Sequence, residues 1–461
     1  MSNTEHTSQH IVLIKRVVIP LLFFIWGVGA SRFDLFPHSL INEAVTDLDL
    51  WLRGNVEGQQ LNFGQKLKAS LVDPELHLSG ESKIDEKFKL TLETVRDPQG
   101  LLKESPRELL YYSVFAKGYY LLFYIPHLPD AYFGALVISG DGEVKKLIKV
   151  PKNQKGRQIL GQGGVTDDGH IIFNSYLSLL VTNICGDRLL EVPTEEGRPF
   201  SQGDGVGFHH KASGDGSLIW TWYGNSLRQY DLRSKTLIRE ISLLELVAAN
   251  PERPVFEARL IKSNLRGTVG QWKYSDLKNG LKLEQISLHD PFHQNDVDVL
   301  PQAKAQLFPN FVPGDLLLSF RSLNLIVVID PNTLKIKWHH FGDFSRQHDP
   351  DWGPNGEIIV YDNRSHQMAS RIISINPVTH KVTTLIDGEE WGFYQFAQGN
   401  QHMSADGRIL FTNNSEVAHA TNDRLDFYFK YKNNRGSALD IGTAYHITEE
   451  QYLEWTRKCG Q

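Results

Sequence analysis

The chain has 461 residues, of which 41% are hydrophobic and 11% aromatic, enough for two or three ordinary domains or for one large all-β barrel or propeller. The formal net charge is −6 at pH 7 and no long run of one charge sign occurs, which argues against a nucleic-acid-binding surface. The two cysteines, Cys185 and Cys459, have no CxxC spacing, so neither a thiolate zinc site nor a redox motif is indicated. A disulfide between them is compatible with export, but the sequence does not show that they meet.

The first thirty residues have the pattern of a secretory signal. Lys15 and Arg16 precede the uncharged apolar segment Val17–Ala30, which ends in the small residues Val28-Gly29-Ala30, a cleavage-site pattern. An uncleaved anchor is the alternative: residues 11–30 would then attach the chain to a membrane, at the cost of burying the two charges. Both interpretations place the globular part outside the cytoplasm, in the periplasm or another extracytoplasmic space.

Residues 31–106 form an N-terminal extension before the main fold. Apolar residues at helical spacing predict a short helix over 38–55, whereas residues 56–106 show no clear pattern. From about Leu109 onward, short β-branched and aromatic runs alternate with glycine-containing turns. Strands at this spacing are typical of a sandwich, a barrel or a propeller.

A repeat favours the propeller. One turn type recurs in DDGHIIF, GDGSLIW, PGDLLLSF, PNGEIIVY and ADGRILF, at residues 167–173, 214–220, 313–320, 354–361 and 405–411. A second turn follows some of these, in DLRSKTLIREI, DPNTLKIKWHH and NPVTHKVTTLI. Four antiparallel strands in a unit of about 40 to 50 residues are a propeller blade, and a sandwich does not require that period.

Counting the units predicts an all-β chain with a six-bladed β-propeller over residues 107–445, six blades being favoured over seven. The candidate blades lie near residues 109–150, 159–193, 207–242, 289–341, 347–387 and 399–432. An insertion at 243–288 contains a short helical pattern, SLLELVAAN. The capping-box sequence Thr448-Glu449-Glu450-Gln451 predicts a C-terminal helix to Lys458 within the segment 446–461.

The segment Gln347–Asn363, QHDPDWGPNGEIIVYDN, shows the repeated unit most clearly. Its Asn355-Gly356 turn separates two extended runs, which is a strong hairpin signal. The two arms of a hairpin end side by side. We therefore expect His348 and Asn363 to be neighbours at one end of a blade.

The other repeats place polar residues at equivalent positions. In a propeller blade the first strand lines the central channel, and its N-terminal end lies on the same face as the junction between the second and third strands. Before or at the first strands stand Gln162, His209, His210, His293, His348, Gln401 and His402. At the junctions between second and third strands stand Arg321, Asn363, Arg371, Asn413, Asn414 and His419.

Several histidines and two arginines at such positions suit nucleophilic or general acid–base chemistry on an anionic group, because imidazole is a nucleophile and base near pH 7 and arginine holds oxyanions. Each residue also has a structural interpretation. A single histidine at a strand start more often satisfies a local hydrogen bond, and Arg321 is equally suited to a structural ion pair. Four aspartates are expected to have structural roles, in which they cap turns or connect adjacent blades: Asp296, Asp298, Asp351 and Asp362. No HxH or HExxH spacing occurs, so catalytic metal is not indicated.

The same residues resemble the bacterial arylsulfotransferase family. The resemblance is carried by HDPDWGPNGEIIVYDN at 348–363, by Ser370–Ile375 with Gly388-Glu389-Glu390, and by His293–Asp298 with LLLSFR at 316–321. It covers roughly residues 205–430 and is specific within 289–420. It implies an exported six-bladed propeller that moves a sulfuryl group from an aryl sulfate ester to a phenol through a sulfohistidine, without cofactor and without phosphoadenosine phosphosulfate.

By motif, the resemblance implies catalytic roles for His293, His348, Arg371 and a late histidine. His419 has about the right place for this nucleophile, and His402 is its rival. Substrate-binding roles are expected for Arg321, Asn363, Asn295, His402 and His210. Two alternatives stay open: a non-catalytic exported propeller that binds a partner or anionic ligand, and a hydrolase or lyase on the same scaffold.

Overall fold

A computed structural model of the chain describes the following residues: 82–102, 108–114, 117–125, 134–150, 162–175, 178–194, 207–251, 292–364, 367, 369–395, 398–413, 415–432 and 440–459. All of them belong to one compact unit, His77–Gln461. The predicted signal or anchor at 1–30, the helix at 38–55 and most of the insertion at 243–288 lie outside the described residues.

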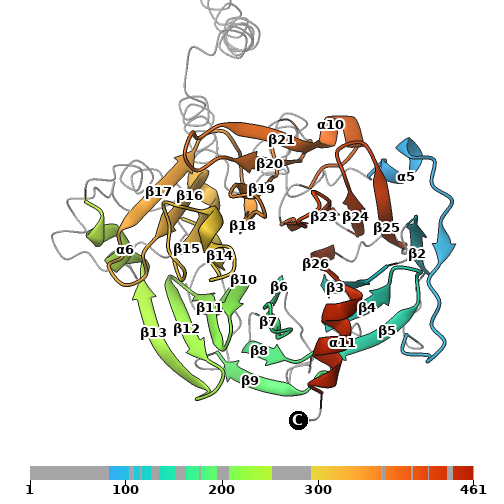
Figure 1. The fold of residues 1–461 in the computed structure, drawn as a ribbon, viewed down its shortest axis with the longest axis horizontal. Helices are drawn as coiled ribbons and strands as arrows, with labels where there is room; N and C mark the ends of the chain where they lie inside the picture. The colour runs from blue at the N-terminus through green and yellow to red at the C-terminus, as the bar shows by residue number, and fades with distance from the viewer. Residues whose placement is uncertain are drawn as a thin grey trace, which may run out of the picture. The chain divides into compact units, whose positions relative to one another are not determined.

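Six antiparallel sheets stand around one axis, which confirms the six-bladed propeller (Figure 1). Blade 1 consists of β26 (Asp440–Ile447), β3 (Tyr119–Ile125), β4 (Gly134–Ser139) and β5 (Val144–Lys149). Blade 2 consists of β6 (Gln162–Val165), β7 (Ile171–Ser175), β8 (Ser178–Thr182) and β9 (Arg188–Pro193). Blade 3 consists of β10 (Phe208–Asp215), β11 (Leu218–Tyr223), β12 (Ser226–Asp231) and β13 (Thr236–Ser242).

The remaining blades follow in chain order. Blade 4 consists of β14 (Gln294–Val299), β15 (Leu316–Phe320), β16 (Leu325–Ile329) and β17 (Ile336–Phe341). Blade 5 consists of β18 (His348–Trp352), β19 (Ile358–Asp362), β20 (Arg371–Ile375) and β21 (Val382–Asp387). Blade 6 consists of β22 (Gln401–Met403), β23 (Ile409–Asn413), β24 (Glu416–Ala420) and β25 (Leu425–Lys432), extended outward by β2 (Glu108–Ser113) and β1 (Glu93–Thr94).

The first blade is assembled differently from the prediction. Residues 109–113, expected in that blade, lie in β2, which pairs with β25 of blade 6. The inner strand of blade 1 is instead β26, which pairs with β3. The two ends of the propeller are therefore interlocked, because the early strand β2 is hydrogen-bonded to blade 6 and the last strand β26 is hydrogen-bonded to blade 1. Pairing between segments this far apart leaves no local signal in the sequence.

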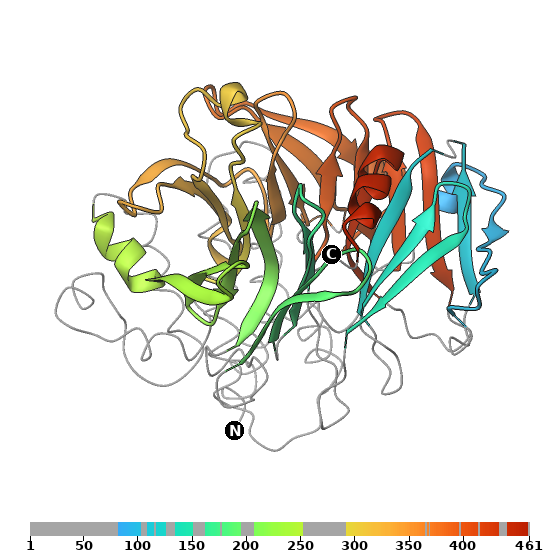
Figure 2. The same cartoon turned by 60° about the horizontal axis from the view of Figure 1, so that its bottom comes forward.

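The inner strands β26, β6, β10, β14, β18 and β22 gather around the axis, as expected of first strands (Figure 2). Their neighbours β3, β7, β11, β15, β19 and β23 are buried and rich in β-branched and aromatic residues, which suits strands covered on both faces. Their side chains interdigitate between blades. Phe123 of β3, for example, packs edge-on against Phe173 of β7, with 5.4 Å between ring centroids.

The helices are few and short. The predicted capping box is confirmed in α11 (Glu449–Arg457), where the Thr448 hydroxyl accepts from the backbone N–H of Gln451 and the Gln451 side chain accepts from that of Thr448. The helical pattern at the start of the insertion forms α6 (Leu243–Ala249), capped by Ser242. The other helices are α5 (Ile84–Lys87), α10 (Gly388–Trp391) and the 3-10 turns η6 (Ala305–Leu307) and η7 (Arg321–Leu323). Within the described part of the chain, none of the helices has the length and apolar character needed to cross a membrane.

The two cysteines are joined. Cys185, in the turn between β8 and β9, forms a disulfide with Cys459, just beyond α11, with 5.8 Å between their Cα atoms. The pairing that the sequence left open thus fastens the C-terminal helix to blade 2. It closes a loop of 274 residues and so limits the freedom of the unfolded chain.

We predict that Cys185→Ser, or reduction of the wild-type protein, lowers the free energy of unfolding by about 2–5 kcal/mol, because a long closed loop is released. Urea unfolding followed by tryptophan fluorescence measures this change. The double variant Cys185→Ser, Cys459→Ser is the control, and reduction is expected to change its stability no further. Equal stability of oxidised and reduced wild-type protein would contradict the prediction.

Candidate functional site

Three histidines and one arginine converge at one end of the propeller axis. They are His210 near the start of β10, His293 directly before β14, His348 at the start of β18, and Arg321 directly after β15. The strand registers place them at the same end of the ring, because Phe208 pairs with Tyr223, Gln294 with Phe320, and His348 with Tyr361. We call these four residues the axial histidine cluster.

His348 and Asn363 are neighbours, as the hairpin predicts. Asn363 donates through Nδ2 to the carbonyl oxygens of Gln395 and Gln398, so its Oδ1 faces His348 Nδ1 at 2.7 Å. That nitrogen therefore carries the ring proton, and Nε2 accepts from the backbone N–H of Gln398 at 3.1 Å. Both nitrogens of this buried imidazole are occupied. Burial and the nearby Arg321 lower the pKa of His348 well below its ordinary value, so the ring is neutral.

Arg321 binds His293 directly. Its Nη1 lies 3.1 Å from His293 Nε2, and because arginine only donates, that nitrogen is the acceptor. The ring of His210 lies 5.0 Å from the ring of His293, nearly edge to face. Burial, His293, His209, His348 and Arg321 together lower the pKa of His210 well below its ordinary value. The cluster thus combines one permanent cation with neutral imidazoles.

The backbone of this end is strained. Five non-glycine residues at this end have left-handed φ values. Four lie at or near the starts of β10, β14 and β18, and the fifth lies in the segment before β22. They are His210 (59°), His293 (46°), Arg346 (56°), Asp349 (52°) and Gln398 (67°). Such non-glycine conformations cost about 1–3 kcal/mol each and gather at functional sites. The sequence gives no signal for them, since none of these residues is a glycine or lies in a two-residue turn.

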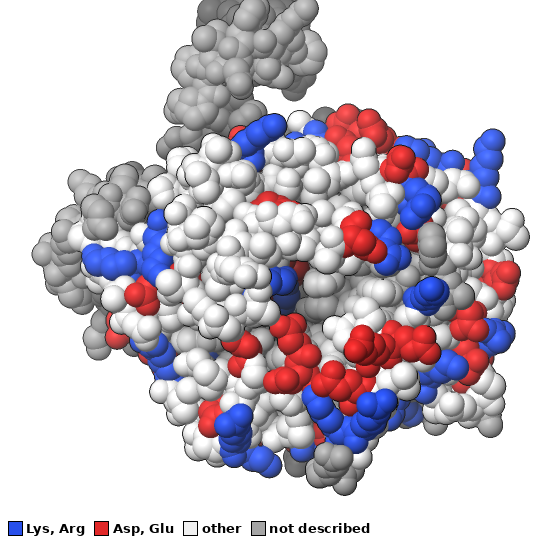
Figure 3. Space-filling model, viewed as in Figure 1, with Lys and Arg blue, Asp and Glu red and all other residues white. Residues whose placement is uncertain are grey.

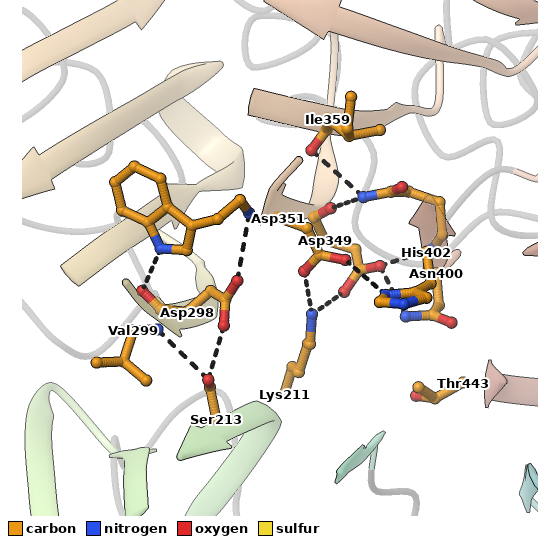
Figure 4. Close-up of polar contacts among 12 residues, drawn as sticks. Lys211, Ser213, Asp298, Val299, Asp349, Asp351, Ile359, Asn400, His402 and Thr443 are labelled. Atoms are coloured by element: carbon orange, nitrogen blue, oxygen red, sulfur yellow. Dashed lines mark hydrogen bonds and ion pairs between the residues drawn. The ribbon is translucent and has the colours of Figure 1, made fainter. Parts of the chain in front are cut away.

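A buried ion cluster is formed by residues that directly follow two of these histidines, farther along the inner strands (Figure 4). Lys211 donates to Asp349 Oδ1 and Asp351 Oδ1, each at 2.6 Å, and its side chain is only 6% exposed. Asp349 also accepts from Asn400 Nδ2 at 2.7 Å and from the backbone N–H of Gln401 at 2.6 Å. Burial opposes the charge of Lys211, but the two carboxylates raise its pKa well above the ordinary value. We call Lys211, Asp349 and Asp351 the lysine–aspartate cluster.

Two further aspartates of β14 border this cluster. Asp298 accepts from the hydroxyl of Ser213 at 2.7 Å, and so ties blade 4 to blade 3, as the structural interpretation predicts. Asp296 is 1% exposed, and its Oδ1 makes no hydrogen bond to any described residue. Burial and the neighbouring carboxylates raise the pKa of Asp296 well above its ordinary value, despite Lys211.

Sequence reasoning missed Lys211 and Asn400. A signal was available for Lys211, since it is a charged residue that follows His209 and His210 within an otherwise buried inner strand. Only a repeat comparison, which aligns Asn400-Gln401 with His293-Gln294, could have indicated Asn400.

The expected role of Arg371 is not supported by its position. Its Nε donates to Asp362 at 2.8 Å, and its Nη2 donates to the carbonyl oxygen of Asp343 at 2.7 Å. Asp362 is fully buried and pairs directly with Arg371 across β19 and β20. Arg371 is thus a structural partner within blade 5 and toward blade 4. The arginine beside the histidines is Arg321.

His419, the expected nucleophile, also lies elsewhere. It pairs with Leu410 near the end of β24 that is remote from Asn413, and so occupies the opposite end of its blade from the axial histidine cluster. It is 1% exposed between blades 6 and 1, with Tyr120 Oη 3.1 Å from Nδ1 and the His446 ring 5.0 Å away. Burial, with His446 and Arg408, lowers the pKa of His419 to about 2.

The remaining predicted site residues have mixed positions. His402 lies near the lysine–aspartate cluster, with Nδ1 3.9 Å from Asp351 Oδ2. Asn295 is buried between blades 4 and 5 and donates to the carbonyl oxygen of Gln347 at 2.8 Å. Gln162 begins β6, and Asn414 lies outside the described residues. No group of three or more metal-ligating side chains with the geometry of a metal site occurs in the part of the chain that the structure describes.

The two ends of the axis differ in charge. On the side where α11 lies, the surface is hollowed near the axis and acidic side chains gather beside the hollow (Figure 3). At the other end, the axial histidine cluster carries one positive charge. That end suits a monoanion with a polar head group, since a guanidinium binds oxyanions through paired N–H donors.

Comparison with known proteins supports the resemblance. Residues 225–424 match the family model described as Arylsulfotransferase (ASST), so this part of the propeller is similar to that family. The match extends from β12 through β24, and it includes His293, Arg321, His348 and Asn363. No curated protein matches the chain.

Several solved structures share parts of this architecture at low similarity. A protein of unknown function from Bacteroides caccae is 10% identical, with a TM-score of 0.45 over 72% of this chain and 100% of that one. A streptogramin B lyase is 12% identical, with a TM-score of 0.38 over 74% and 95% of the two chains. Virginiamycin B lyase from Staphylococcus aureus is 12% identical, with a TM-score of 0.38 over 71% and 99%. At these scores the likenesses carry no argument about function.

We predict that Lys211→Met destabilises the protein by about 3–5 kcal/mol, because Asp349 and Asp351 then remain buried without their counter-ion. Chemical denaturation at pH 7 measures the loss. Lys381→Met, at an exposed position, is the matched control and is expected to leave stability within about 0.5 kcal/mol of wild type. A small loss in the Lys211 variant, similar to that of the control, would refute the structural role of the cluster.

We predict that His419 makes the protein less stable as the pH falls. Its pKa is about 2 in the folded chain and 6.5 in the unfolded chain, so below pH 6.5 the unfolded state binds a proton that the folded state does not. Stability should therefore fall by about 1.4 kcal/mol per pH unit from this group, and His419→Gln should remove that part of the slope between pH 6 and 4.5. Denaturant unfolding at several pH values measures both slopes.

Tyr120→Phe is the control for this experiment. It removes the hydroxyl next to His419 but keeps the buried imidazole, so the slope should remain although the stability falls. If His419→Gln has the same slope as wild type, the imidazole is not held neutral by burial.

Proposed function

We propose, on the premise that residues 225–424 form an arylsulfotransferase-like domain, that the chain transfers a sulfuryl group from an aryl sulfate ester to a phenol. The observation that carries the proposal is the axial histidine cluster, in which Arg321 lies among three imidazoles at one end of the axis. An aryl sulfate is a monoanion, and the single guanidinium balances its charge. Transfer passes through a sulfohistidine and uses no phosphoadenosine phosphosulfate.

Arg321 has the role that the resemblance gave to Arg371. Its Nη1 already points into the cluster toward His293, so the guanidinium is placed to hold sulfonate oxygens as charge develops on them. His293 accepts from Arg321 through Nε2, which fixes the orientation of the guanidinium. The second nitrogen of His293 carries the ring proton in this arrangement and is suited to pass it to a departing phenolate.

His348 and Asn363 are positioning residues in this proposal. Both nitrogens of His348 are occupied, and the amide of Asn363 is fully used by His348, Gln395 and Gln398. Neither is placed to bind a sulfonate oxygen or to protonate a leaving group without first breaking these hydrogen bonds. Together they fix the start of β18 against the segment that leads into β22.

We also propose that the chain acts outside the cytoplasm. The disulfide between Cys185 and Cys459 supports this location, since such bonds persist in oxidising compartments. The basic and apolar sequence at residues 15–30 has the corresponding targeting pattern.

The central test is transfer from 4-nitrophenyl sulfate to phenol. We predict that Arg321→Met lowers kcat/KM by about 100-fold or more, because a transition-state charge contact is lost. Arg321→Lys should recover only part of this, since an ammonium group lacks the planar pair of donors. Nitrophenol release and phenyl sulfate formation measure the reaction.

Arg233→Met, at an exposed position of blade 3, is the control and should keep wild-type kinetics. Nitrophenol release that does not depend on phenol, without phenyl sulfate, would show a hydrolase instead. No product with any aryl sulfate, from a folded protein, would reject catalysis and leave a binding propeller.

A further inference from the structure

The proposed reaction needs an imidazole nitrogen whose lone pair is both available and accessible, and the following histidines do not offer one. His348 uses both nitrogens, and His293 Nε2 accepts from Arg321. His209 Nε2 lies 2.8 Å from the carbonyl oxygen of Gly224, and its side chain is only 2% exposed. His419 lies at the other end of its blade and is buried against Tyr120.

His210 differs from all of these. Its ring makes no hydrogen bond, through either nitrogen, to any residue that the structure describes, and the residue is only half-buried. The ring lies 5.0 Å from that of His293 and 5.2 Å from that of His209, so other imidazoles border it without occupying its nitrogens.

The backbone holds this ring at the axis. His210 has a φ of 59°, and the ladder between β10 and β11 is interrupted between His209 and Ser213. Asn174 of blade 2 stabilises the irregular segment, because its Nδ2 donates to the carbonyl oxygens of both His209 and His210, at 2.9 and 2.8 Å. On the C-terminal side, Lys211 fixes the chain through Asp349 and Asp351. The strained conformation is thus over-determined by neighbours on both sides.

We infer that His210 is the nucleophile that accepts the sulfuryl group. The inference rests on the proposed function and names the residue that acts in it. The neutral nitrogen of His210 attacks sulfur, an N–S bond forms, and the bond between sulfur and the phenolic oxygen breaks with its electron pair on that oxygen. His293 passes its ring proton to the phenolate and regains one from the other ring nitrogen of His210, which sulfonation makes acidic. The products are N-sulfohistidine and the free phenol.

The second half of the cycle returns the group. The acceptor phenol gives its proton to the unsulfonated ring nitrogen as its oxygen attacks sulfur, the N–S bond breaks, and neutral His210 is restored. Arg321 is held beside the reacting ring by its hydrogen bond to His293, and it stabilises the sulfonate oxygens in both steps. The low pKa of His210 keeps the lone pair available in mildly acidic solution.

Peptide mapping tests the assignment in the wild-type protein. The full chain is incubated with 4-nitrophenyl sulfate alone and digested with trypsin at mildly alkaline pH, since sulfohistidine is labile to acid. The sequence places the candidate histidines in separate peptides: 189–211 for His209 and His210, 283–304 for His293, 347–364 for His348, 382–408 for His402 and 409–424 for His419. Fragmentation of the first peptide distinguishes His210 from His209.

We expect the sulfuryl label on His210. A label on His209, His293, His348, His402 or His419 would overturn the assignment while leaving the proposed function intact. Failure of the wild-type protein to become labelled and to transfer the group at all would instead refute the proposed function itself.

Two variants complete the test. His210→Gly is well suited to the positive φ and should fold, and it should lower transfer by about 10⁴-fold or more, as expected for loss of a nucleophile. Added imidazole should restore part of this activity by entering the vacated space. His380→Gln, at an exposed turn of blade 5, is the control and should retain wild-type transfer. Full transfer by His210→Gly without imidazole would refute the inference.

Discussion

A single buried ammonium group organises the centre of this propeller. Lys211 of blade 3 binds Asp349 and Asp351 of blade 5, and Asp349 accepts from Asn400 of blade 6. The amide oxygen of Asn400 in turn accepts from the backbone N–H of Ala444, in the strand that closes blade 1. A buried ion pair is stable only where its remaining hydrogen-bonding capacity is satisfied, and these contacts supply that. One connected network therefore joins four of the six blades at the axis.

This network also fixes the candidate site, because its members are sequence neighbours of the site histidines. His210 directly precedes Lys211, and His348 directly precedes Asp349. The pull of the ion pair toward the axis holds both strand starts in conformations that a free chain would avoid, with positive φ at His210 and Asp349. Stability and site geometry are thus set by the same interaction.

The sequence predicted the features that depend on short-range patterns. The glycine turns, the short apolar strands and the repeat of about 40 to 50 residues predicted the six blades. The hairpin at 347–363 predicted the contact between His348 and Asn363. It did not predict ring closure by β26, which pairs residues more than three hundred positions apart. It placed Arg371 at the junction of β19 and β20, where it lies, but did not indicate its contact with Asp362, and it placed His419 at the wrong end of its blade. Both lie in strands as expected, but the face to which a side chain points, and the partner it finds there, depend on register and bulges that no local pattern encodes.

The charge distribution along the axis explains why a cluster of so few groups suffices for an anionic substrate. At the end where the inner strands begin, Arg321 is the cation, and the pKa values of His210 and His348 are so low that these rings add no charge. Deeper along the axis, Lys211 is already paired with two carboxylates, Asp349 and Asp351. Among the described groups of the axis named here, a monoanion is therefore attracted to the guanidinium of Arg321 rather than to the buried ammonium group. Within the axial histidine cluster the positive charge lies on the guanidinium of Arg321, beside the imidazoles, where the proposed sulfuryl transfer requires it.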